Sequence, residues 1–177
     1  MGNGLVDYID RLQLMAFFAG YPLIYAFVYV IAGEKRKDPA SFSSRMVRSL
    51  PFAYALTATL FLGLILKDMS PDYSLKNITA QFQSTYLKSW GLIAILFWFP
   101  ALSKKTFFSL LHSFVFFFLL IKDLFMFMNA SIDREMIQND MKIYSTSLIL
   151  NISTWAFIII IGFTLHAILK NKKSHVS

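Results

Sequence analysis

Residues 146–169 read TSLILNISTWAFIIIIGFTLHAIL and contain no Asp, Glu, Lys or Arg. A helix needs roughly 20 consecutive apolar residues to cross the hydrocarbon core of a bilayer, so this segment is long enough for a transmembrane helix. Its few polar residues, among them Asn151 and Thr154, can form hydrogen bonds with neighbouring helices. The segment predicts a membrane protein built from helices.

The composition of the whole chain agrees with this prediction. Of its 177 residues, 56% are hydrophobic and only 15% are charged, whereas a soluble domain carries about 25% charged residues. A bilayer can solvate so much apolar surface, but water cannot. The chain has no cysteine, which excludes a disulfide scaffold, thiol catalysis and thiolate metal sites.

Four more apolar stretches lie before residues 146–169 in the chain, at 12–33, 50–66, 87–102 and 107–128. We therefore predict an all-α, polytopic transmembrane bundle of five helices in a single domain, residues 1–177. The stretches 50–66 and 87–102 are short, because a helix rises about 1.5 Å per residue. A four-helix bundle, with one of these two re-entrant, is the alternative. Pro22, two residues after Gly20, predicts a kink in the first helix.

The basic residues favour five crossings. Five crossings place three segments on one side of the membrane: 34–49, 103–106 and 170–177. They place the other three on the opposite side: 1–11, 67–86 and 129–145. The first group holds ten Lys and Arg in 28 residues, and the second holds five in 48. Because Lys and Arg accumulate in cytoplasmic loops, we expect the N-terminus outside and the C-terminus in the cytoplasm.

Residues 50–55, LPFAYA, and 71–78, PDYSLKNI, resemble segments of small polytopic bacterial inner-membrane proteins of unassigned function. The resemblance covers residues 50–78, about one-sixth of the chain, and carries no functional residue with it. It implies a multi-pass protein of the bacterial inner membrane.

Lys122 and Asp123 lie within the predicted fourth helix, flanked by apolar residues. Ionisable side chains at membrane depth are costly and point to an ion pathway or to a charged partner subunit. The alternative is that both extend to the headgroups. Lys67 and Asp68 end the second helix in the same way, which favours this second interpretation.

His112 and His166 lie at similar depths in the predicted fourth and fifth helices. Two histidines from different helices can ligate a haem axially, and a haem-binding redox subunit is therefore one alternative function. Polar interfacial residues are the simpler interpretation, and we expect no metal or cofactor.

Two sets of residues at four-residue spacing predict helix packing, since this spacing places side chains on one helix face. One set is aromatic and consists of Tyr21, Tyr25 and Tyr29. The other set is small and consists of Ala55, Thr59 and Gly63. Small residues let helices approach closely in a bilayer.

The segment 34–49 is the most basic in the chain. We expect its cations to contact anionic lipid headgroups. They are Lys35, Arg36, Lys37, Arg45 and Arg48.

These features favour a non-catalytic inner-membrane subunit that scaffolds or modulates a larger complex, such as motor, secretion or transport machinery. The predicted loops are too short for a soluble domain, and no catalytic motif is present. We expect membrane lipids and other integral membrane subunits, or copies of the same chain, as partners, and no nucleic acid. A homo-oligomeric ion channel is the second alternative function.

Overall fold

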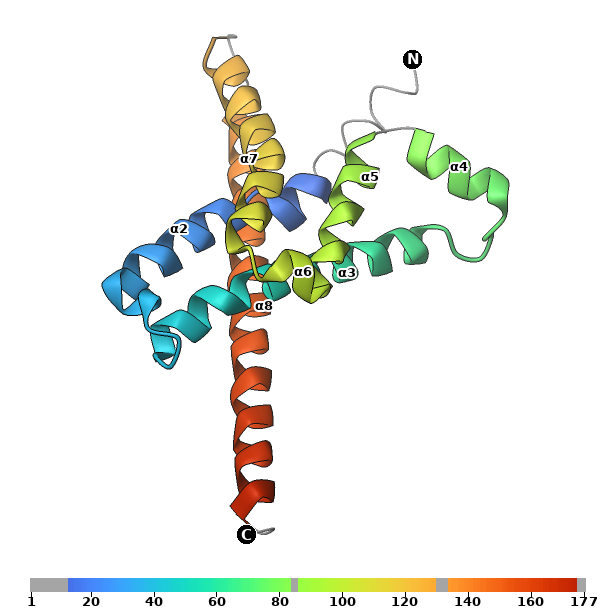
Figure 1. Cartoon of the computed structure of the whole chain (residues 1–177). Helices are drawn as coiled ribbons and strands as arrows, with labels where there is room; N and C mark the ends of the chain where they lie inside the picture. The colour runs from blue at the N-terminus through green and yellow to red at the C-terminus, as the bar shows by residue number, and fades with distance from the viewer. Residues whose placement is uncertain (1–12, 84–85, 130–133, 175–177) are drawn as a thin grey trace.

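The computed structural model describes residues 13–83, 86–129 and 134–174, and every regular element in these ranges is a helix (Figure 1). A short helix at 13–18 comes first. The others are α2 (Tyr21–Ala32), η1 (Gly33–Lys37), α3 (Phe42–Asp68), α4 (Leu75–Gln83), α5 (Tyr86–Ile93), η2 (Ala94–Trp98), α6 (Pro100–Ser103), α7 (Thr106–Asn129) and α8 (Arg134–Ser174).

Three helical stretches in the described part of the chain are long and apolar enough to cross a membrane: Gln13–Lys37, Phe42–Asp68 and Lys142–Leu169. They indicate a helical membrane protein. The apolar helices Tyr86–Trp98 and Thr106–Lys122 are shorter. Tyr86–Trp98 rises only about 20 Å, against roughly 30 Å of hydrocarbon.

The second predicted helix begins earlier than its apolar composition indicates. The Ser41 hydroxyl accepts a hydrogen bond from the Ser44 N–H, which caps α3 at its first turn. Arg45 and Arg48 therefore lie on α3 and not in a loop. The third predicted helix is divided instead, because Phe99 precedes Pro100 and takes an extended conformation (ψ 129°).

The first predicted helix is interrupted at Ala19–Gly20, so Pro22 lies in the first turn of α2 and not inside a continuous helix. Side chains of α8 form hydrogen bonds with the backbone at this interruption. The Gly20 N–H donates to Ser147 Oγ at 2.8 Å, and Asn151 Nδ2 donates to the Phe17 carbonyl at 2.9 Å. Backbone groups released at a kink in a membrane helix need such partners from a neighbouring helix. We call these contacts the Gly20 clasp.

Phe18 lies at the centre of the aromatic core and is fully buried. Its ring stacks on Phe116 of α7 at 4.7 Å and meets Tyr54 and Phe61 of α3 edge-on at 5.8 and 5.4 Å. These are favoured aromatic geometries, and they join the first helix to α3 and α7.

Helix α8 has 41 residues, so its length of about 60 Å is twice the hydrocarbon thickness. It crosses α2 and α3 at a steep angle and runs on beyond them toward the C-terminus (Figure 1). Among the α8 side chains that the structure describes, Ser147, Asn151 and Thr154, at helical spacing, are buried where the helices cross. Thr154 and Thr57 of α3 form a hydrogen bond of 3.2 Å between their hydroxyl groups.

Candidate functional site

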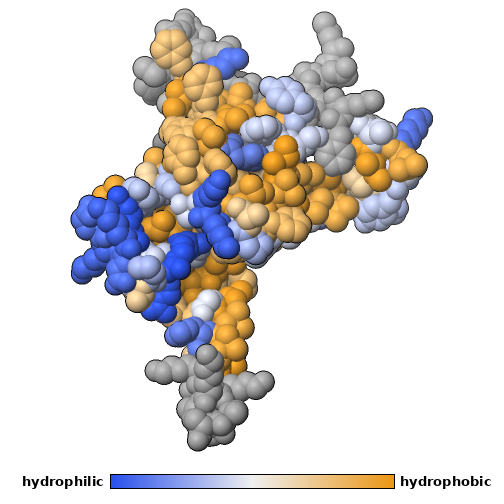
Figure 2. Space-filling view, in the orientation of Figure 1, coloured by the Kyte–Doolittle hydropathy of each residue, from blue (hydrophilic) through white to orange (hydrophobic). Residues whose placement is uncertain are grey.

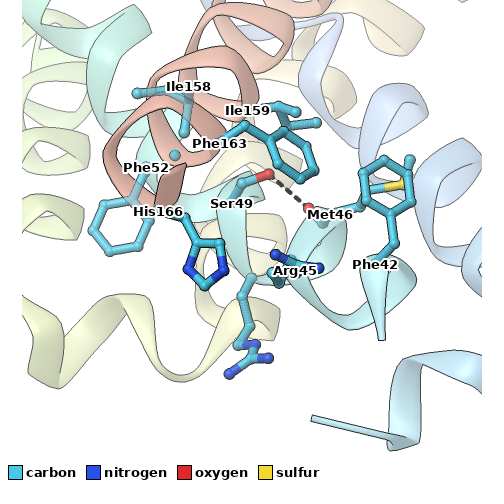
Figure 3. Close-up of a pocket in the computed structure, with 11 residues that line it drawn as sticks. Phe42, Arg45, Met46, Ser49, Phe52, Ile158, Ile159, Phe163 and His166 are labelled. Atoms are coloured by element: carbon cyan, nitrogen blue, oxygen red, sulfur yellow. Dashed lines mark hydrogen bonds between the residues drawn. The ribbon is translucent and has the colours of Figure 1, made fainter. Parts of the chain in front are cut away.

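A pocket of about 370 Å³ lies between the first turns of α3 and the C-terminal half of α8 (Figure 3). Arg45, Arg48 and Phe52 line it from α3. Phe163 and His166 line it from α8. Beyond the contact at Thr154, α8 stays in contact with the first turns of α3, where the Phe42 and Phe163 rings stack at 5.5 Å beside the pocket.

The pocket is basic at one end. The Arg45 guanidinium lies 5.4 Å from the centre of the Phe163 ring, within the range of a cation–π contact. Arg48 donates to the carbonyl oxygens of Pro39 and Ser44, which fixes its side chain near α3. No acidic residue is among the described residues that line the pocket, so its cations have no carboxylate beside them there.

Gly162 keeps the α8 wall of the pocket open. A Cβ atom built on Gly162 would have no other heavy atom within 4 Å, and the residue lines the pocket. A larger side chain at this position would extend into unoccupied space. Apart from Ser49, the remaining lining is apolar and includes Ile158 and Ile159 of α8 and Phe52 of α3.

A cluster of aromatic and polar side chains is buried inside the bundle, around His112 of α7. Tyr54 Oη lies 2.9 Å from His112 Nδ1, and the Trp90 ring of α5 stacks on the imidazole at 4.7 Å. Trp90 Nε1 also donates to the His112 carbonyl at 3.3 Å. His112 Nε2 is buried without a hydrogen-bond partner among the described residues. This group connects three helices through one side chain.

We expect Tyr54→Phe to destabilise the protein by about 1 kcal/mol, because it removes the hydrogen bond to His112 inside a buried site. The measurement is the unfolding midpoint in mixed detergent and SDS, followed by circular dichroism. Tyr29→Phe is the control, since the hydroxyl of the exposed Tyr29 makes no hydrogen bond within the described residues. Equal midpoints for the two variants would contradict the role of the Tyr54 hydroxyl.

The tyrosine set lies along α2 with different surroundings at each position. Tyr21 Oη is 2.7 Å from Ser109 Oγ of α7. Tyr25 donates to Thr106 Oγ1 at 3.4 Å. The Tyr29 ring is exposed and lies 4.1 Å from the Arg36 guanidinium. The first two thus contact α7, and the third contacts the basic segment.

The small-residue set on α3 is divided in the same way. Ala55 is fully buried. Thr59 accepts a hydrogen bond from Trp98 Nε1 at 3.0 Å. Gly63 is exposed, and a Cβ built there would have no other heavy atom within 4 Å. Among the described residues, close packing along this set is therefore confined to its first member.

The predicted ionisable and haem-ligating residues occupy separate places. Lys122 is exposed on α7, and the side chain of Asp123 lies outside the described residues. His112 is enclosed by aromatic rings in the bundle, whereas His166 is exposed and lines the pocket. The rings packed around His112, those of Tyr54, Trp90, Phe97 and Phe116, are not among the residues that line the pocket with His166.

The basic segment divides between a turn and a helix. Lys35, Arg36 and Lys37 lie in η1, where Lys37 pairs with Glu34 and Arg36 donates to the Gly33 carbonyl at 2.8 Å. Figure 2 shows this hydrophilic surface beside the hydrophobic surface of α8. Only Arg45 and Arg48 of the predicted set reach the pocket.

Sequence reasoning did not select Phe52, Gly162 and Phe163 as site residues, and it considered His166 only as a haem ligand. One feature of the sequence does point to this site. Arg45 and Arg48 lie three residues apart at the start of an apolar helix. Nothing in the sequence indicates that the end of α8 lies beside them.

The chain matches no family model, no curated protein and no solved structure. Its function therefore has to be inferred from its own residues and contacts.

Proposed function

We propose that the protein is a non-catalytic integral membrane subunit of a larger complex, and that α8 packs against a transmembrane helix of a different chain. The observation that carries this proposal is the exposure of α8. Its most apolar 18-residue window has a mean hydropathy of 2.2, the highest of the three long stretches, yet only 11% of that window is buried. The corresponding values for Gln13–Lys37 and Phe42–Asp68 are 56% and 50%.

The composition of one α8 face favours a protein partner over lipid alone. Ser153, Phe157, Ile160 and Thr164 lie on a single face, given 100° per residue, and all four are exposed. We call them the exposed face of α8. Hydroxyl residues among large apolar ones are typical of surfaces that join helices in a bilayer. Phe157 and Ile160 are 54% and 61% exposed, which leaves room for a partner.

The satisfied polar groups of the bundle also favour a structural role. Tyr21 with Ser109, and Thr57 with Thr154, form buried pairs in which each hydroxyl has its partner. Hydroxyl groups that form hydrogen bonds between two helices hold those helices together. Scaffolding or modulating a motor, secretion or transport complex is consistent with such a bundle.

Co-purification in mild detergent tests the proposal. The tagged wild-type chain should retain one partner in fixed stoichiometry, identified by mass spectrometry. Phe157→Ala combined with Ile160→Ala should reduce its recovery at least tenfold. Phe27→Ala with Val30→Ala is the matched control, because these two α2 residues are at least as exposed, at 61% and 77%. A lone monomer under several detergents would refute the proposal, and recovery of a second copy of this chain would favour a homo-oligomer.

The proposal includes five crossings in a bacterial inner membrane, with the C-terminus in the cytoplasm. Because the chain has no cysteine, single substitutions report the side on which a residue lies. With five crossings, an impermeant maleimide should label Lys37→Cys and Lys104→Cys from one side and Asp72→Cys from the other. With three crossings, Lys104→Cys and Asp72→Cys would be labelled from the same side.

A further inference from the structure

We propose that the pocket between α3 and α8 binds one anionic phospholipid, with the headgroup phosphate at Arg45, Arg48 and His166 and the start of an acyl chain along Phe52 and Phe163. This inference concerns a ligand site and is independent of the proposed role in a complex. The contacts of the pocket residues carry it.

The cationic end of the pocket has the chemistry of a phosphate site. A guanidinium presents several N–H donors in a planar array that fits phosphate oxygens. Arg45 makes a cation–π contact but no ion pair within the described residues, so its donors are available. Arg48 is held in place by two backbone carbonyl groups. His166 of α8 and Arg45 of α3 both line the pocket (Figure 3).

The apolar residues of the same pocket have the chemistry of an acyl-chain site. Phe52, Ile158 and Phe163 supply apolar walls, and Gly162 leaves the space between them open. The volume of about 370 Å³ falls in the range of small-molecule sites. It fits a headgroup and the first part of one chain, while the remainder would lie in the bilayer.

The position of the pocket along both helices also fits a lipid. Arg45 lies in the basic segment, in the first turn of α3, and His166 lies four residues before Lys170. Both helices thus meet the pocket where apolar sequence changes to basic sequence, which is the position of the headgroup layer. Basic pockets between membrane helices on the cytoplasmic side bind anionic lipid headgroups.

The pocket and the proposed partner surface do not compete for the same residues. Gly162 and His166 lie on the opposite side of α8 from Phe157 and Ile160, since the two pairs are separated by roughly half a turn around the helix axis. One side of the helix faces the pocket, and the other carries the exposed face. Lipid and partner protein can therefore bind at the same time.

Native mass spectrometry of the full-length protein tests the inference. The protein is titrated with phosphatidylglycerol, which is anionic, and with phosphatidylcholine, which is zwitterionic. We expect one phosphatidylglycerol to bind at least tenfold more tightly than phosphatidylcholine. Arg45→Gln with Arg48→Gln should abolish this preference. Lys104→Gln with Lys105→Gln, which removes the same charge outside the pocket, should preserve it.

A second pair of variants tests the pocket with every cation retained. Gly162→Leu fills the apolar part and should weaken phosphatidylglycerol binding at least tenfold. Gly63→Leu is its control, because both glycines have open space around the Cβ position. Equal binding by these two variants, or equal loss in both charge variants, would overturn the proposal. Displacement of the lipid by glycerol 3-phosphate at equal concentration would overturn it in favour of a soluble anion.

Discussion

Replacing Gly20 by alanine should destabilise the protein by about 3 kcal/mol, the upper range for adding a methyl group to a fully packed site. A Cβ atom there would lie 2.8 Å from the Leu148 nitrogen and the Ser147 carbonyl carbon, and both are backbone atoms of α8. The Gly20 backbone is helical, with φ −76°, so the cost arises from space and not from backbone strain. Helix α8 would have to move, which would break the Gly20 clasp.

The unfolding midpoint in mixed detergent and SDS measures this effect. Gly63→Ala serves as the control, because its added Cβ has no heavy atom within 4 Å. Alanine is the better helix former by roughly 1 kcal/mol in soluble helices, so Gly63→Ala should be neutral or slightly stabilising. If Gly20→Ala unfolds at the same SDS fraction as Gly63→Ala, the close contact with α8 does not exist.

Phe18→Ala should have the second large effect, about 3 kcal/mol, near the lower end for truncating a buried Phe. The substitution removes the ring that contacts Phe116, Tyr54 and Phe61. In a bilayer the unfolded helix still lies in lipid, so the loss comes mainly from the cavity and from missing dispersion contacts. That is why the lower end of the range is expected.

The same unfolding assay tests this prediction, with Phe27→Ala as the matched control. Phe27 is 61% exposed on α2, and surface truncations usually change stability by less than about 0.5 kcal/mol. A loss of stability in Phe27→Ala as large as that in Phe18→Ala would mean that the aromatic core does not determine stability.

Several local features of the fold follow from short stretches of sequence. The apolar stretches predict helices, because a helix satisfies its own backbone hydrogen bonds in lipid. Gly20 and Pro22 predict a kink in the first helix, and the structure has an interruption at Ala19–Gly20. The early start of α3 needed one further observation, the Ser41 cap. Capping depends on one hydrogen bond outside the apolar stretch, so a search for apolar residues misses it.

The sites depend on contacts between residues far apart in the chain. Arg45 was predicted to contact headgroups from its charge alone, but its neighbour Phe163 comes from another helix. His112 and His166 were paired by their estimated depth in the membrane. The structure places one in the bundle and the other at the pocket, because His112 of α7 packs against Tyr54 and Trp90, whereas the part of α8 that carries His166 lies beside the first turns of α3.

The sequence by itself determined that this is a helical membrane protein, since apolar length and low charge are properties of each segment alone. The tertiary structure decided which face of α8 is buried and where the pocket opens. Those outcomes arise from the crossing of α8 with α2 and α3, which is fixed by the close approach at Gly20 and by the hydrogen bonds of Ser147, Asn151 and Thr154. The stretch 146–169 specifies a helix, but its partners determine what that helix can bind.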